Sequence, residues 1–112
     1  MAQRYCLALD LRDDPTAWDE YDRYHLEVWP EILASIREAG IESMQIYRTG
    51  NRLFMIMETA ASFSFADKGA ADAANPVVQK WETLMSTFQQ ALPWAKPGEK
   101  WLLMNKVFDL GK

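Results

Sequence analysis

The chain has 112 residues, the length of one domain (1–112), and its 49% hydrophobic and 25% charged residues are typical of a globular protein rather than a disordered or fibrous one. The formal net charge is −4 and no basic run is present, so neither nucleic acid nor an anionic membrane surface is expected as a partner. No apolar run approaches the ~20 residues that span a bilayer, and the N-terminus has no signal-peptide pattern.

Cys6 is the only cysteine, so no disulfide can form within the chain. An almost cysteine-free chain is typical of a reducing compartment, and we therefore expect a cytoplasmic protein. Cys6 lies within an apolar, strand-like run, where a structural thiol is far more common than a nucleophile.

The first predicted element is a strand over Arg4–Leu11, apolar enough to lie centrally in a sheet. Asp14–Pro15 is an N-cap and first-turn pair, and it predicts the start of a helix over Pro15–Ala39. Pro30 lies in the middle of that helix and removes a backbone hydrogen bond. We therefore expect a kink or a break between Leu26 and Trp29.

Gly40 is the expected stop of this helix, and a second strand is predicted over Ile41–Tyr47. A turn at 49–52, with Gly and Asn available for positive φ, joins it to a third strand. The third strand, Leu53–Thr59, has so few polar residues that we expect it to be central or covered on both faces.

The alanine-rich segment Ala60–Asn75 predicts a short helix and a loop. Asn75 followed by Pro76 is a capped start for a second long helix, predicted over Pro76–Leu92. A proline-containing loop, 93–98, then leads to a last strand over Lys100–Leu110.

The order strand, helix, strand, strand, helix, strand is that of the split βαβ or ferredoxin-like α+β fold. Its two helices cover one face of the sheet, and no further segment of the chain is left to cover the other, apolar face. An open apolar face of this size is typical of an interface. The pattern therefore predicts a homodimer.

The candidate functional residues lie around His25, the only histidine. Tyr21 precedes it by four residues and Trp29 follows it by four, so a continuous helix places the three on nearly one face. The sequence contains no metal-ligand spacing, no Gly-rich phosphate loop and no nucleophile elbow, so we expect neither a metal nor a cofactor. Acid–base chemistry by His25 remains, helped by Tyr21 or a carboxylate. The simpler alternative is an amphipathic helix with no catalytic role.

Trp81 and Glu82 form a second candidate pair. A tryptophan face can stack on the C–H face of a sugar, while a neighbouring carboxylate binds the sugar's hydroxyl groups. The alternative is a core tryptophan followed by a solvated glutamate.

The segment with Tyr21, His25 and the run Trp29-Pro30-Glu31 resembles the signature of the L-rhamnose mutarotase family. Later segments agree with it in order and spacing over nearly the whole chain, namely Gly40, Ile46–Tyr47, Leu53–Glu58, Val78–Trp81 and Val107–Phe108. The resemblance implies a dimeric α/β barrel that interconverts the α and β pyranose anomers of a 6-deoxy sugar without a cofactor. It also implies that His25 is the proton donor and that Tyr21 and Trp81 contact the sugar.

Two positions depart from the rhamnose enzymes of that family, which carry a tyrosine in place of Met44 and a second tryptophan in place of Glu82. A site with one aromatic wall fewer and one carboxylate more need not prefer L-rhamnose. Related proteins are associated with L-fucose, so the sugar stays open between the two.

Two other functions are compatible with the topology, since fold alone does not define function. One is a dimeric-barrel oxygenase that acts on an aromatic substrate or haem, which absorbance with and without added haem would reveal. The other is a non-catalytic sugar-binding module, which the presence of Glu82 in place of an aromatic wall would favour.

Overall fold

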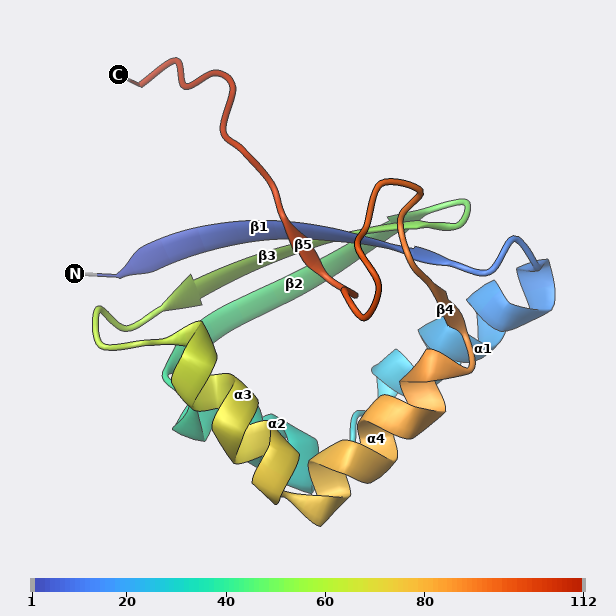
Figure 1. The fold of residues 1–112 in the computed structure, drawn as a ribbon, viewed down its shortest axis with the longest axis horizontal. Helices are drawn as coiled ribbons and strands as arrows, with labels where there is room; N and C mark the ends of the chain where they lie inside the picture. Colours follow the sequence, from blue (N-terminus) through green and yellow to red (C-terminus); the bar gives the residue numbers. More distant parts are fainter. Residues whose placement is uncertain (1, 112) are drawn as a thin grey trace.

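In the computed structural model, which describes residues 2–111, an antiparallel sheet lies above a layer of four helices (Figure 1). In chain order the elements are β1 Gln3–Leu11, α1 Pro15–Leu26, α2 Pro30–Glu38, β2 Ile41–Thr49, β3 Arg52–Thr59, α3 Phe65–Ala74, α4 Pro76–Ser86, β4 Gln89–Gln90 and β5 Leu102–Leu103. No helix among the described residues is long and apolar enough to cross a membrane.

The sheet has the order β2-β3-β1-β4, and β5 also pairs with β1. β1 runs antiparallel to β3 in an unbroken register from Gln3↔Thr59 to Asp10↔Arg52. The chain crosses from β1 to β2 through α1 and α2, and from β3 back to the β1 edge through α3 and α4. This α+β topology confirms the predicted ferredoxin-like pattern. The first crossover contains two helices where one was predicted, and the second contains the predicted short helix as α3, followed by α4.

The period-two pattern of the strands decides which sheet face meets the helices. In β1, Leu7, Leu9 and Leu11 are buried, and in β3 the buried residues include Leu53 and Met55. Leu11 and Leu53 belong to one hydrophobic cluster, and Leu7 and Met55 belong to a second. Trp101 packs against both clusters. The space between the sheet and the helices is where the candidate site lies.

The helix predicted over residues 15–39 is broken, as Pro30 indicated. α1 ends at Leu26, and α2 begins at Pro30 with Trp29 as its N-cap residue. At the first position of a helix the missing N–H of proline costs nothing, because that group has no partner within the helix. Since Trp29 lies outside α1, the expectation that it shares one helical face with Tyr21 and His25 is wrong.

The helix predicted over Pro76–Leu92 is shorter than expected. Asn75 begins it as predicted, with its side-chain oxygen accepting hydrogen bonds from the N–H groups of Val77 and Val78. The helix ends at Ser86 because the chain then pairs with β1, where the Arg12 N–H donates to the Phe88 carbonyl and β4 follows. Sheet pairing therefore replaces the last helical turns.

The last strand, predicted over Lys100–Leu110, is mostly absent. Only Leu102–Leu103 form β5, and the Met104 N–H donates the next bond to the Cys6 carbonyl at 2.8 Å. The tail then turns away from the sheet (Figure 1), leaving Val107 and Phe108 exposed. A strand forms only beside a neighbour, and beyond Met104 the tail has left β1.

Candidate active site

A cleft of about 1410 Å³ lies between the inner face of the sheet and the helices. Its walls include Tyr21 and His25 from α1, and Trp81 and Glu82 from α4, together with Gln89 from β4. The sheet contributes mainly apolar side chains, among them Met44, Ile46, Met55 and Met57. A mostly apolar cleft with a few convergent polar groups is the usual form of a small-molecule site.

Tyr21 and His25 form the polar centre of this cleft. Four residues apart on α1, they lie one above the other, with ring centroids 4.2 Å apart and ring planes tilted by 30°. The Nδ1 atom of His25 lies 2.7 Å from the backbone carbonyl oxygen of Tyr21. Because a carbonyl can only accept a hydrogen bond, Nδ1 carries the proton, and Nε2 of the neutral ring has a free lone pair.

The surroundings of the two side chains determine their protonation. Burial lowers the pKa of His25 below its ordinary 6.5, although the hydrogen bond to the Tyr21 carbonyl and the charge of Asp22 act in the opposite direction. Burial raises the pKa of Tyr21 far above its ordinary value, with Gln89 acting against that shift. At neutral pH His25 is therefore a neutral base, and Tyr21 is a protonated hydrogen-bond donor.

Trp81 fixes the position of the His25 ring from α4. The two rings meet edge to face, with centroids 5.7 Å apart at 70°. Trp29 packs against Trp81 in the same manner at 5.0 Å, and Tyr24 does so at 6.4 Å. Trp81 is only 8% exposed, so it belongs both to the core and to the cleft wall.

Glu82 lies beside Trp81 but at the rim of the cleft. Its carboxylate oxygen Oε2 is 3.6 Å from the Lys100 ammonium nitrogen, and both side chains are partly exposed. An exposed ion pair of this kind contributes little to stability. The carboxylate therefore remains available for hydrogen bonds from a ligand's hydroxyl groups.

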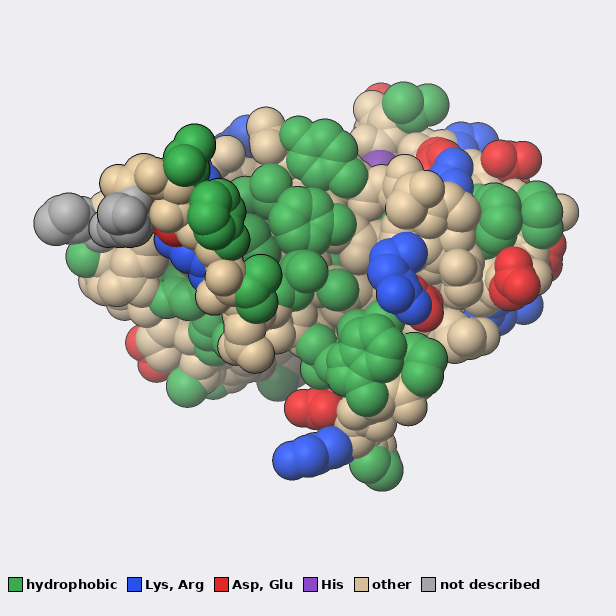
Figure 2. Space-filling view, turned by 90° about the horizontal axis from the view of Figure 1, so that it is seen from above, with side chains coloured by type: hydrophobic (Ala, Val, Ile, Leu, Met, Phe, Trp, Pro, Cys, Tyr) green, Lys and Arg blue, Asp and Glu red, His purple; other side chains and the backbone are tan. Residues whose placement is uncertain are grey.

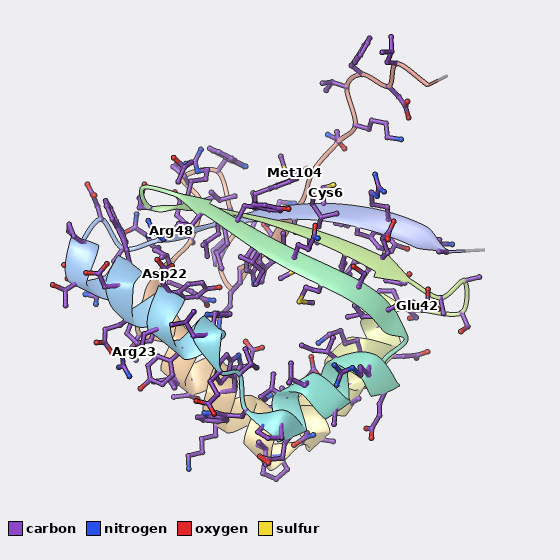
Figure 3. All side chains as sticks on the ribbon, turned by 180° about the vertical axis from the view of Figure 1, so that it is seen from behind. Cys6, Asp22, Arg23, Glu42, Arg48 and Met104 are labelled. Carbon is purple, nitrogen blue, oxygen red and sulfur yellow. The ribbon has the colours of Figure 1, made fainter. Side chains whose placement is uncertain are left out.

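Asp22 forms an ion pair with Arg48, and this pairing makes its carboxylate a poor acid–base group. The guanidinium donates from Nε to Oδ1 at 2.9 Å and from a terminal nitrogen to Oδ2 at 2.6 Å, which ties α1 to β2 (Figure 3). These bonds lower the pKa of Asp22. Asp22 therefore stays ionised and acts on His25 only through its charge.

A family model described as L-rhamnose mutarotase matches residues 4–110 of the chain. The chain belongs to the L-rhamnose mutarotase family. An L-fucose mutarotase from Xanthomonas campestris pv. campestris is 46% identical over 112 residues, covering 98% of this chain and 90% of the relative. An L-rhamnose mutarotase from Phocaeicola vulgatus is 32% identical over 80 residues, covering 70% and 73%.

The fold agrees with this assignment. The crystal structure of an L-rhamnose mutarotase from Formosa agariphila superposes with a TM-score of 0.70 at 21% identity, and the match covers 96% of this chain and 98% of that one. The resemblance seen in the sequence is thus confirmed, and the protein is a sugar mutarotase, an isomerase. These comparisons favour mutarotation over the oxygenase and the sugar-binding module.

In this mutarotase the four residues predicted for the site line one cleft. His25 and Tyr21 meet at its centre, while Trp81 and Glu82 come to it from another helix. Their individual roles stay predictions. Among residues 2–111, no group of three His, Cys, Asp or Glu side chains lies close enough together to hold a metal ion.

Among the residues that line the cleft, Gln89 and Trp101 were not candidates in the sequence analysis. Gln89 falls in what was predicted to be the last turn of a helix, so its position on a strand had no signal in the periodicity. Trp101 follows the proline-containing loop, and only the path of that loop brings it to the cleft. Neither residue type by itself indicates a site.

Proposed function

We propose that this mutarotase converts the pyranose anomers of a 6-deoxy-L-hexose, with L-fucose as its preferred sugar and His25 as its catalytic acid–base group. The observation that carries the proposal is the neutral His25 ring, with its free Nε2, beside the protonated Tyr21 in a cleft large enough for a hexose. Trp81 supplies an aromatic surface, and Glu82 supplies acceptors for hydroxyl groups at the rim.

Mutarotation needs the net transfer of one proton. In the proposed mechanism, Nε2 of His25 removes the proton from the anomeric hydroxyl as the bond between C1 and the ring oxygen breaks. The imidazolium then gives that proton to the ring oxygen, which has just left C1 and is still close to the anomeric oxygen, so one ring nitrogen can reach both atoms. Tyr21 stabilises the charge on the ring oxygen with a hydrogen bond during the transfer.

The open-chain aldehyde closes again after its C1 group rotates, and the same steps run in reverse on the other face of the carbonyl. Atoms and protons balance without a cofactor, and His25 ends as it began. A positioned acid–base group of this type contributes roughly 10²–10⁴ in rate. That is enough for a reaction which already proceeds slowly in water.

The choice of L-fucose follows from two differences at the cleft. Met44 and Glu82 line it at the positions where rhamnose enzymes of the family, as the sequence analysis noted, carry aromatic residues. The identity of 46% to an L-fucose mutarotase, against 32% to an L-rhamnose mutarotase, supports the same choice.

The test is saturation-transfer NMR of anomer exchange on L-fucose, L-rhamnose and D-glucose with the purified protein. We expect the exchange of L-fucose to be accelerated most and that of D-glucose least. Faster exchange of L-rhamnose than of L-fucose would contradict the proposed substrate. The absence of acceleration with all three sugars would contradict the proposed function itself.

We further propose that the working unit is a homodimer. The sheet face that points away from the helices carries Cys6, Ala8, Phe54, Ile56 and Tyr47. Figure 2 looks onto this side of the molecule and shows hydrophobic side chains gathered across it. Tyr47 is 54% exposed, and the tail adds the exposed residues Val107, Phe108 and Leu110. An apolar surface of this extent supports coverage by a second copy.

We also propose that the dimer works in the cytoplasm, with a small sugar as its partner and with neither nucleic acid nor a membrane bound. Cys6 is a free, half-buried thiol, which fits a reducing compartment. The net charge of −4 gives no attraction for phosphate.

A further inference from the structure

Gln89 lies on the wall of the cleft at the edge of the sheet. β4 pairs antiparallel with β1, which places Gln89 opposite Leu11 and Gln90 opposite Asp10. Successive residues of a strand point to opposite faces. Gln89 accordingly lines the cleft, while Gln90 is exposed and does not line it.

The carboxamide oxygen of Gln89 is buried without a hydrogen-bond partner, and it is the one buried side-chain polar atom in this condition among residues 2–111. Leaving a buried acceptor unpaired destabilises a fold, so buried acceptors are nearly always paired. Groups that break this rule concentrate at functional sites, where a ligand supplies the missing partner.

The surroundings of Gln89 show which ligand would suit it. Its side chain opposes the rise in the pKa of Tyr21, so it lies close to the Tyr21 hydroxyl group, and both residues line the cleft. Two polar groups thus stand together on a wall whose nearby members, such as Met85, are apolar. Polar groups placed in this way fix the orientation of a bound molecule.

We propose that Gln89 is a specificity-determining residue, whose carboxamide binds one hydroxyl group of the sugar next to Tyr21. The inference rests on the proposed function and deepens it. A carboxamide has both an acceptor and donors, and a hydroxyl group is both donor and acceptor, so the two groups can satisfy each other. The hydroxyl group that it binds takes no part in the bond that breaks, and the contact therefore acts on binding rather than on the chemical step.

The class of sugar selected follows from stereochemistry. L-fucose and L-rhamnose differ in the orientation of the hydroxyl groups at C2 and C4. A single directed hydrogen bond to one of these hydroxyl groups distinguishes the two sugars, because the wrong epimer leaves the carboxamide unpaired. Gln89 is therefore expected to recognise the orientation of the hydroxyl group at C2 or at C4.

The variant Gln89→Leu tests the inference, with Gln90→Leu on the outer face of the same strand as its control. Calorimetric titration and NMR exchange should show that Gln89→Leu binds L-fucose about fivefold more weakly and raises KM by a similar factor, with kcat nearly unchanged. The preference for L-fucose over L-rhamnose should shrink by the same factor. The melting temperature should stay the same or rise, since an apolar side chain replaces a buried unpaired oxygen. Gln90→Leu should leave both binding and KM unchanged.

Deoxy analogues locate the contact. Wild type should bind either 2-deoxy- or 4-deoxy-L-fucose more weakly than L-fucose, and Gln89→Leu should bind that analogue and L-fucose equally. Unchanged affinity for L-fucose in Gln89→Leu, or a fall in kcat with KM constant, would overturn the inference. A lower melting temperature with equal losses for every sugar would show a structural role instead. A wild type that neither binds nor converts any of these sugars would overturn the proposed function as well.

Discussion

At the scale of single residues, the account depends on the protonation of His25. Its Nδ1–H donates a hydrogen bond to the Tyr21 carbonyl, while Nε2 keeps its lone pair. Burial keeps the ring neutral. The Tyr21 hydroxyl, buried deeper, keeps its proton. The pair thus combines one base and one donor at the same place.

The rate should depend on pH through His25. Because its pKa lies below 6.5, the base form predominates at pH 7, and the enzymatic rate should fall only when the pH drops below 6.5. The measurement is kcat/KM for anomer exchange between pH 5 and 8, with the uncatalysed exchange in the same buffers subtracted. A rate that already falls between pH 8 and pH 7 would contradict the neutral base.

The same shift predicts a dependence of stability on pH. The folded chain holds His25 neutral, while the unfolded chain binds a proton near pH 6.5, so the unfolding free energy should decline as the pH falls below that value. Urea unfolding at pH 7.5 and pH 5 should show a larger decline for wild type than for His25→Gln. Equal declines would mean that other groups account for the acid sensitivity.

Glu82 should contribute to sugar binding without affecting the chemical step. Removing its carboxylate in Glu82→Ala should raise KM for L-fucose by about three- to tenfold, with kcat nearly constant. This is the loss of affinity expected when one or two hydrogen bonds to the sugar are removed. Glu31→Ala, an exposed glutamate on α2 outside the cleft, is the matched control. Equal KM values for the two variants would show that Glu82 does not bind the sugar.

Residue spacing and residue type, together with the family resemblance, predicted the four candidate residues that line the cleft. Tyr21 and His25 are neighbours because four residues make about one helical turn, and Trp81 and Glu82 follow from an amphipathic helix with a clear start. Gln89 could not be predicted, because its side chain enters the cleft only when the chain leaves the helix and pairs with β1.

At the scale of elements, local signals predicted where the helices begin better than where they end. Pro30 and Asn75 act through their own backbone and side-chain chemistry, and the structure follows them. The end of α4 and the short β5 depend instead on which strand lies next to the chain. Pairing of that kind is a tertiary property that a local pattern does not contain.

Asn75 should stabilise the helix that carries Trp81 and Glu82. Its side-chain oxygen accepts hydrogen bonds from two N–H groups of the first turn, at 3.0 and 3.3 Å. Asn75→Ala should lower the unfolding free energy by about 1 kcal/mol, and Asn75→Asp, which keeps the acceptor, should lower it far less. Urea unfolding at pH 7 measures both variants, and an equal loss in the two would contradict the capping role.

At the scale of the whole molecule, the helices cover one face of the sheet and a second copy is proposed to cover the other. The central βαβ order was predictable because alternating apolar residues and turn signals divide the chain clearly. The position of the tail was not, since residues 105–111 form no strand beside β1.

Ile56→Glu should separate the dimer, because it places a charge in the middle of the outer face of the sheet. Sedimentation should give about twice the chain mass of 12.9 kDa for wild type and the single mass for the variant, with circular dichroism confirming that the variant is folded. Leu26→Glu changes an 87% exposed leucine on α1 and should leave the dimer intact. A monomeric wild type would contradict the proposed assembly.

The central claim is that His25 in this cleft carries out the exchange of sugar anomers. The most direct measurement is saturation transfer between the anomers of L-fucose with wild type and with His25→Asn, which retains a polar side chain of similar reach. The account predicts that the variant loses about 10²–10⁴ of the catalysed rate while it still binds the sugar. A variant that exchanges L-fucose as fast as wild type would contradict the account.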